Sequence, residues 1–161
     1  MGISIQMYTL RDFTKTPDQL RGTLARVADI GYKTVQISVP AWLSTEALKM
    51  MLDDAGLAAD SVMAPTATIH ERIDEIIRVS AILQTDTVRT DGIPHGYSET
   101  AEGFSQYAQI LQSAGCLLRK HGLHFMYHNH AIEYTNFPEC TGMDILLRET
   151  DPDCVWFQPD V

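Results

Sequence analysis

The sequence predicts an α/β fold of the (β/α)8 TIM-barrel type, with about six βα units in its 161 residues. Short strand-like runs alternate with longer helical patterns, at a period of about thirty residues that suits βαβ units. Within the strands, apolar and polar residues alternate. Because no linker or low-complexity tract divides the chain, we expect a single domain over 1–161.

The first half of the chain contains three predicted strand–helix pairs. The first helix carries Leu20, Leu24 and Val27 at helical spacing. Gly31 and Gly56 follow the first two helices, where glycine commonly ends a helix. Strands are expected at Ile3–Tyr8, Thr34–Val39 and Asp60–Ala64, and helices at Pro17–Ile30, Ser44–Ala55 and Ala67–Leu83.

The second half continues the same alternation. A loop rich in Gly and Pro follows the fourth strand at 91–96, and Gly122 ends the long helix after it. Strands are expected at Asp86–Thr90, Leu123–His128 and Cys154–Asp160, and helices at Thr100–His121 and Gly142–Glu149.

The alternation within the strands favours a barrel over a doubly wound sheet. Successive side chains of a strand point to opposite faces. A doubly wound sheet buries both faces and needs apolar strands throughout, whereas the inner wall of a barrel can carry polar groups at its carboxyl end. The fifth strand separates Phe125 and Tyr127 from His124 and His128. We therefore expect a polar inner face.

The length departs from a whole barrel, which usually needs about 250 residues. The pattern stops at the sixth predicted strand, so we expect strands 7 and 8 to be absent. The chain would then be a fragment, a truncated product or one part of a larger assembly. Open sheet edges of this kind favour association, and we expect a homo-oligomer.

Charge and cysteine content restrict the partners and the compartment. The formal net charge is −9, which argues against nucleic acid or an anionic membrane as a partner. No apolar run approaches the roughly 20 residues that would span a bilayer, and the N-terminus shows no signal-peptide pattern. The cysteines Cys116, Cys140 and Cys154 are widely spaced and without a CxxC motif, so we expect reduced thiols in a cytoplasmic protein.

The densest chemical signal lies at the end of the fifth strand, where four of the six histidines fall within 121–130. His128 and His130 share a face, and Glu133 follows. Imidazole and carboxylate groups are common ligands of divalent metals. Asp160, at the end of the sixth strand, is a second candidate ligand. Polar loop histidines without a metal, and a loop or capping acid at Asp160, are equally open interpretations.

Other polar groups are weaker candidates. Gln6 and Tyr8, on the polar face of the first strand, could line a pocket for hydroxyl groups. Arg89 and Asp91 could face the same cavity, but a structural ion pair is the preferred interpretation. The sequence contains neither a glycine-rich phosphate loop nor a GxSxG motif.

Several segments together resemble the xylose-isomerase-like TIM barrels of the sugar phosphate isomerase/epimerase family. The similarity is spread over the whole chain, and its motifs are fairly specific in combination although weak singly. The segments that carry it are Ile5–Asp12, Val27–Gln36, Tyr127–Tyr134, Leu146–Pro152 and Phe157–Val161.

The resemblance implies a (β/α)8 barrel that binds a small sugar or polyol and a divalent metal (Mn, Mg, Co or Zn), and that isomerises the sugar through an enediol. It implies His128 and Asp160 as metal ligands and Glu133 as a catalytic acid. The implied substrate-binding residues are Gln6, Tyr8, Asn129 and His130. Gln36 and Met63 stand where many relatives have Glu and His, a departure from the usual two-acid site.

Two alternatives remain open at this point. An apurinic-site endonuclease-like hydrolase would share the barrel, although it needs a basic groove for DNA. A non-catalytic fragment or binding module would share the fold without a complete site.

Overall fold

The computed structural model describes residues 3–160, which form two compact units. The first comprises residues 3–63 and 77–86, and the second comprises residues 64–76 and 87–160. Each unit contains parallel strands and helices, so the predicted α/β class is confirmed. The predicted single domain over 1–161 stays a prediction.

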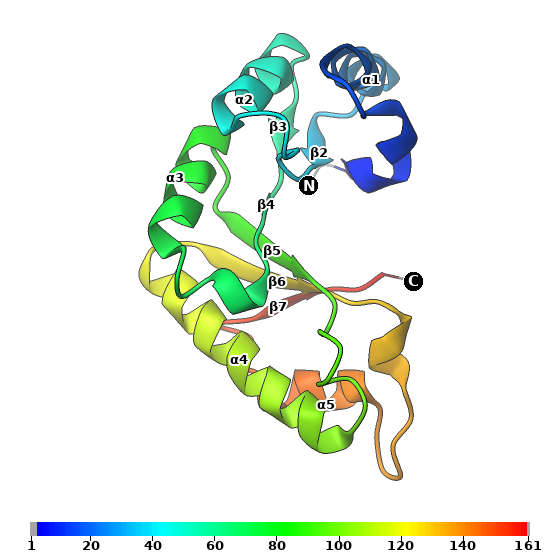
Figure 1. The fold of residues 1–161 in the computed structure, drawn as a ribbon, viewed down its shortest axis with the longest axis vertical. Helices are drawn as coiled ribbons and strands as arrows, with labels where there is room; N and C mark the ends of the chain where they lie inside the picture. The colour runs from blue at the N-terminus through cyan, green and yellow to red at the C-terminus, as the bar shows by residue number, and fades with distance from the viewer. Residues whose placement is uncertain (1–2, 161) are drawn as a thin grey trace. The chain divides into compact units, whose positions relative to one another are not determined.

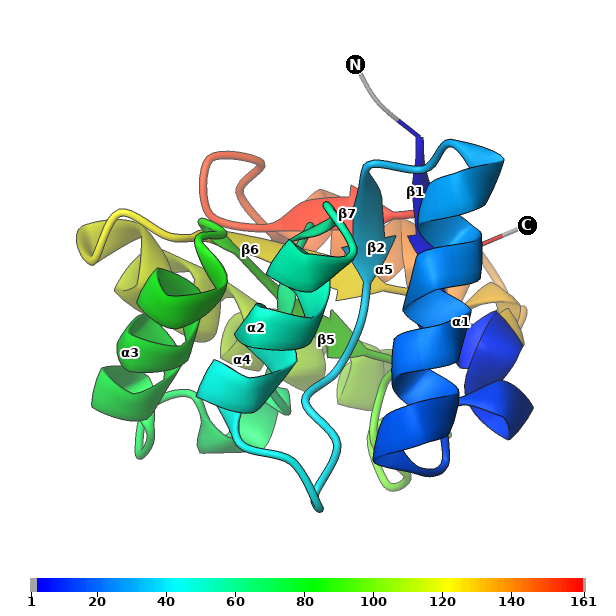
Figure 2. The ribbon, with the colours of Figure 1, turned by 90° about the horizontal axis from the view of Figure 1, so that it is seen from above.

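The first unit has a parallel sheet in the order β1-β2-β3, with Ile5 of β1 opposite Val35 of β2. Figure 2 shows α1 and α2 beside these strands. The unit also contains the end of α3. Its elements are β1 (Ser4–Gln6), the 3-10 helix η1 (Met7–Phe13), α1 (Pro17–Ile30), β2 (Thr34–Gln36), α2 (Thr45–Asp54), β3 (Ala58–Ala59), β4 (Val62–Met63) and α3 (Ile73–Leu83).

Local signals fix the bounds of α1. The Thr16 hydroxyl accepts a hydrogen bond from the Gln19 amide at 3.3 Å, which is an N-cap. Gly31 follows the last helical residue in a left-handed conformation. Between these ends, Leu20 and Leu24 are fully buried in the core of the first unit together with Val35. The predicted bounds of this helix are therefore confirmed.

The second unit contains a longer parallel sheet in which β6 lies between β5 and β7. Figure 1 shows α4 running along one side of these strands. The start of α3 belongs to this unit as well. Its other elements are the 3-10 helix η2 (Thr66–Thr68), β5 (Thr87–Asp91), α4 (Ala101–Lys120), β6 (His124–His128), the 3-10 helix η3 (Ala131–Tyr134), α5 (Gly142–Glu149) and β7 (Trp156–Gln158).

The two faces of this sheet differ as the sequence predicts. Phe125 and Tyr127 of β6 are buried, and the Tyr127 ring packs edge-on against Tyr107 of α4, with 6.2 Å between ring centroids. On the opposite parity, His124 stacks on Trp156 of β7 at 4.1 Å. The apolar parity therefore faces the helix layer, and the polar parity faces away from it.

Several elements are shorter than predicted. The first strand ends at Gln6, and the chain continues as η1 instead of reaching Tyr8. The helix predicted over 67–83 begins only at Ile73. The hydroxyl of Thr68 donates to the Pro65 carbonyl at 2.9 Å, a local bond that competes with a helical start. The strand β3 was not predicted, because two alanines carry no strand pattern.

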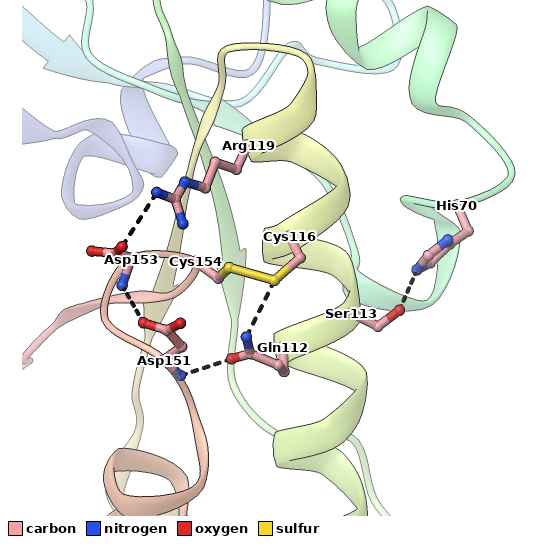
Figure 3. The surroundings of a disulfide bond; sticks show 8 residues. All are labelled: His70, Gln112, Ser113, Cys116, Arg119, Asp151, Asp153 and Cys154. Carbon is pink, nitrogen blue, oxygen red and sulfur yellow. Dashed lines mark hydrogen bonds and ion pairs between the residues drawn. A yellow bond between two sulfur atoms is a disulfide. The ribbon is translucent and has the colours of Figure 1, made fainter.

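The expectation of three reduced cysteines is wrong for two of them. Cys116 of α4 and Cys154, in the turn before β7, form a disulfide (Figure 3). Cys140 is free. The pairing joins residues 38 positions apart, and no spacing motif in the sequence indicates it. Within residues 3–160, no helix combines the length and the apolar character needed to cross a bilayer.

Candidate functional site

The ends of three neighbouring strands form a polar row in the second unit. Asp91, His128 and Gln158 are the last residues of β5, β6 and β7, and the sheet register places them opposite one another. Because residues in register in a parallel sheet share a face, the three side chains lie on the face away from α4. The carboxyl ends of the strands are where barrel enzymes place their sites.

His128 and Asp160 lie side by side at this edge. The distance from His128 Nε2 to Asp160 Oδ2 is 3.6 Å. The His128 side chain is 7% exposed and that of Asp160 is 61% exposed, so a buried imidazole meets a carboxylate open to solvent. Two of the residues predicted from the sequence are thus neighbours in space.

Burial and charge favour the neutral form of the His128 imidazole. Burial lowers its pKa from the ordinary value of 6.5, and the positive charge of Arg89 lowers it further. Asp160 acts in the opposite direction but does not reverse the shift. Within residues 3–160, the buried His128 Nδ1 has no hydrogen-bond partner. A neutral imidazole of this kind can accept a hydrogen bond or bind a metal.

Arg89 and Asp91 add charge to the same face. The Arg89 guanidinium forms an ion pair with the Asp91 carboxylate, and Arg89 is itself buried. The register aligns Arg89 with Met126, two residues before His128. The preferred interpretation as an ion pair is confirmed, and the pair also lies on the face of the polar row. Asp91 was placed at the cavity only as the less preferred interpretation, and Gln158 was not predicted as a member of the site, although the alternation that placed His128 there includes both.

Asn129 holds the end of β7 against the end of β6. Its side-chain oxygen accepts a hydrogen bond from the Asp160 amide at 2.9 Å, and its Nδ2 donates to the Asp160 carbonyl at 3.3 Å. The residue is 1% exposed. The carboxamide expected to bind substrate is therefore used to fix the backbone of Asp160 beside His128.

Glu133 is buried beneath the loops of the site. Its carboxylate accepts hydrogen bonds from the amide of His130 at 2.8 Å, from the amide of Ile93 at 3.1 Å and from the hydroxyl of Tyr127. Burial, followed by the bond to Glu133, raises the pKa of the Tyr127 hydroxyl. Glu133 is 0% exposed, so it joins the loop after β5 to the loop after β6 and has no face open to a substrate. This differs from the catalytic position expected for it.

His130 is exposed at the rim of the site. Its ring lies edge-on to that of His128, with 5.4 Å between ring centroids. It also covers Gly92, where an added Cβ would lie 2.5 Å from His130 Nδ1. Gly92 has a φ of +56°, which favours glycine. The sequence predicted His130 at this edge, and the structure places it next to His128.

Gln6 and Tyr8 belong to the first unit. Gln6 Nε2 donates to Gln36 Oε1 at 3.3 Å, which joins the ends of β1 and β2. Tyr8 is 70% exposed, and the Arg11 guanidinium lies over its ring at 4.6 Å. The two predicted residues therefore lie in different elements, because Gln6 ends β1 and Tyr8 belongs to η1. Gln6 is half-buried, whereas Tyr8 is exposed to solvent.

The side chains near His128 include residue types that commonly bind metal ions. His128 and Asp160 have the chemistry of metal ligands, and His128 Nε2 is the ring nitrogen that faces the Asp160 carboxylate. A catalytic zinc site usually has three protein ligands. Over residues 3–160, no group of three His, Cys, Asp or Glu side chains gathers around one point. Among the described residues, the pair of His128 and Asp160 therefore stands without a third such side chain.

Comparisons with known proteins bear on the fold. No protein-family model and no curated protein matches the chain. Among solved structures, a sugar phosphate isomerase/epimerase from Parabacteroides distasonis matches with a TM-score of 0.83 and 23% identity, over 99% of this chain and 65% of that one. This chain thus spans somewhat less than two thirds of that protein.

Two further structures have the same fold at lower similarity. A xylose isomerase-like TIM-barrel protein from Mycobacterium smegmatis, in complex with magnesium, matches with a TM-score of 0.64 and 18% identity, over 99% of this chain and 64% of that one. An AP endonuclease of family 2 from Brucella melitensis matches with a TM-score of 0.68 and 14% identity, over 98% and 68%. The chain therefore has the fold of the xylose-isomerase-like TIM barrels, as part of such a barrel.

Proposed function

We propose that the chain belongs to an enzyme that isomerises or epimerises a sugar or sugar phosphate through an enediol, at the carboxyl ends of β5, β6 and β7. The observation that carries the proposal is the contact between His128 and Asp160 within an in-register polar row. The fold shared with a sugar phosphate isomerase/epimerase supports the same reaction class.

The residues have different roles in this proposal. His128 and Asp160 would be two ligands of a divalent metal, one of Mn, Mg, Co or Zn, with further ligands supplied from outside the described set. When bound, such a metal would polarise the sugar carbonyl as a Lewis acid. His130, exposed beside His128, would donate or accept a hydrogen bond at a sugar hydroxyl. Gln6 and Tyr8 stay proposed as substrate-binding residues.

Asn129 and Glu133 act as positioning residues in the proposed site. Asn129 keeps Asp160 beside His128 through its two backbone bonds. Glu133 holds the His130 amide and the loop after β5 through the Ile93 amide. We therefore assign Glu133 to the support of the site rather than to proton transfer, because all three of its bonds point into the protein.

An apurinic-site endonuclease is the second candidate, favoured by the fold shared with the Brucella protein. A formal net charge of −9 argues against it, since binding to a phosphate backbone depends on Lys and Arg. A duplex with a single abasic site, titrated at low salt, separates the two. Tight binding of this duplex would favour the endonuclease. We expect no tight binding of the duplex to the chain. A cytoplasmic location and a homo-oligomeric state stay predictions.

Sugar binding and turnover test the proposal. Saturation-transfer NMR of the chain with free and phosphorylated ketoses and aldoses, in the presence of Mg²⁺, should show contact with at least one sugar. A sugar that is also turned over in D₂O should take up solvent deuterium, because an enediol exchanges the proton of the reacting carbon.

Matched histidine variants make the test specific. His128→Gln should weaken the affinity for the sugar about tenfold or more, which is about 1.4 kcal/mol or more of binding free energy, because the imidazole proposed as a metal ligand is lost. His124→Gln lies on the same strand and the same face, at its opposite end, and should leave binding unchanged. Two results would contradict the proposed site: an equal loss of sugar affinity in both variants, or a sugar affinity that neither substitution changes.

A further inference from the structure

The disulfide joins the long helix of the second unit to the last strand. Cys116 lies in α4 and Cys154 lies in the turn that leads into β7, with their Cα atoms 5.0 Å apart. This separation is ordinary for a disulfide. Cys116 is half-buried, whereas Cys154 is only 6% exposed. Cys116 is therefore the half of the disulfide that is more open to a small thiol reagent.

Noncovalent contacts hold the same two segments together (Figure 3). Gln112 Oε1 accepts a hydrogen bond from the Asp151 amide at 2.7 Å, and its Nε2 lies 3.2 Å from Cys116 Sγ. Arg119 pairs with Asp153 at 3.2 Å. These contacts flank the disulfide on both sides. After reduction they would keep the two thiols close to each other, which makes re-oxidation favourable.

The disulfide also acts on the candidate site. It closes a segment that contains β6 and η3, and therefore His128 and Glu133. Asp160 follows Cys154 at the far end of β7 and is held there by Asn129. The short strand β7 is thus fixed at its start by the disulfide at Cys154 and at its end by the hydrogen bonds of Asn129. Loss of the disulfide would loosen the strand and with it the placement of Asp160.

We propose that the Cys116–Cys154 disulfide is a redox switch that sets the order of β7, and with it the position of Asp160 beside His128. In the cytoplasm, the location predicted from the sequence, disulfides are usually redox-sensing or catalytic, whereas disulfides are typically structural in secreted proteins. The half-buried Cys116 and the contacts that survive reduction favour the reversible form.

The chemistry of the switch is thiol–disulfide exchange with a dithiol. One thiolate of the dithiol attacks Cys116 Sγ, the bond to Cys154 breaks, and the Cys154 sulfur leaves as a thiolate that takes up a proton. The second thiol of the reagent then displaces Cys116 from the mixed disulfide. The protein gains two electrons and two protons, and the dithiol becomes a cyclic disulfide. Oxidised glutathione reverses the exchange.

Hydrogen exchange on the full chain tests the switch. The Cys140→Ser background removes the free thiol and leaves the pair intact. Loop closure over the 38 residues predicts an unfolding constant roughly several-hundred-fold larger after reduction. Locally, dithiothreitol should speed amide exchange in 151–160 about tenfold or more, and oxidised glutathione should restore it. Exchange in α1 of the first unit should change much less than exchange in 151–160 at times shorter than global unfolding.

A second variant controls for the reagent. Cys116→Ala combined with Cys154→Ala should exchange rapidly in 151–160 from the start and should not respond to dithiothreitol. Two outcomes would overturn the proposal: three titratable thiols in the native wild-type chain equilibrated with oxidised glutathione, or equal exchange in 151–160 before and after reduction. Amide exchange is measured without any sugar, so a failure of the redox proposal can be told apart from a failure of the proposed function.

Discussion

Replacement of glycine by alanine should change the free energy of unfolding in opposite directions at Gly115 and at Gly22. The reason is that α4 approaches the turn before β7 closely at Gly115, whereas α1 has open space at Gly22. Gly115 lies inside α4, and an added Cβ would overlap the Cys154 carbonyl oxygen and lie 2.9 Å from its carbonyl carbon. Gly22 lies inside α1, where an added Cβ meets nothing within 4 Å. Replacement of glycine by alanine inside a helix stabilises it by about 1 kcal/mol when space permits. Overpacking against a backbone costs about 1–3 kcal/mol.

We therefore expect Gly22→Ala to raise the free energy of unfolding by about 1 kcal/mol. Gly115→Ala should lower it by up to about 2 kcal/mol, because the helical gain offsets only part of the overpacking cost. In a chain of this size the difference between the two variants, about 1–3 kcal/mol, corresponds to roughly 2–12 °C in melting temperature. Urea and thermal unfolding followed by far-UV circular dichroism measure both variants. Equal stabilisation by the two substitutions would refute the close approach of α4 to Cys154.

Three further predictions concern the site. Asn129→Ala should lower the free energy of unfolding by about 1–3 kcal/mol, since two buried bonds to the Asp160 backbone are lost, and NMR should show displaced Asp160 signals. Tyr127→Phe should lower the free energy of unfolding in urea by about 1.5–3 kcal/mol, because the buried Glu133 carboxylate loses a donor. The third prediction concerns pH: because the folded-state pKa of His128 lies below the ordinary 6.5, the unfolded chain binds more protons than the folded chain as the pH falls through 6.5. Wild-type stability should therefore drop between about pH 7 and 5 by more than that of His128→Gln. An identical pH dependence in the two proteins would count against the lowered pKa.

The fold was largely predictable because its signals are local and periodic. Leu20, Leu24 and Val27 indicate one buried helix face, and all three are buried in the structure. The alternation in β6 correctly assigned Tyr127 to the helix layer and His128 to the opposite face. Parallel strands in register then bring their carboxyl ends together, so the contact between His128 and Asp160 followed from the pattern.

The supporting residues were not predictable from the same signals. The burial of Glu133 depends on the path of two loops, and its carboxylate would look the same in sequence if it faced a substrate. The bonds of Asn129 to the Asp160 backbone depend on where β7 ends. The pairing of Cys116 with Cys154 arises from packing between α4 and a turn far along the chain. These are tertiary contacts, and no periodicity records them.

The central claim is that His128 and Asp160 are neighbours on the polar face of the sheet. Long-range ¹H–¹⁵N NMR of the imidazole nitrogens gives the pKa of His128 directly, and we expect it below 6.5. The Asp160 carboxylate raises that pKa, so Asp160→Asn should lower it further, whereas Glu139→Gln should not change it. A His128 pKa that is the same with and without the Asp160 carboxylate would contradict the account.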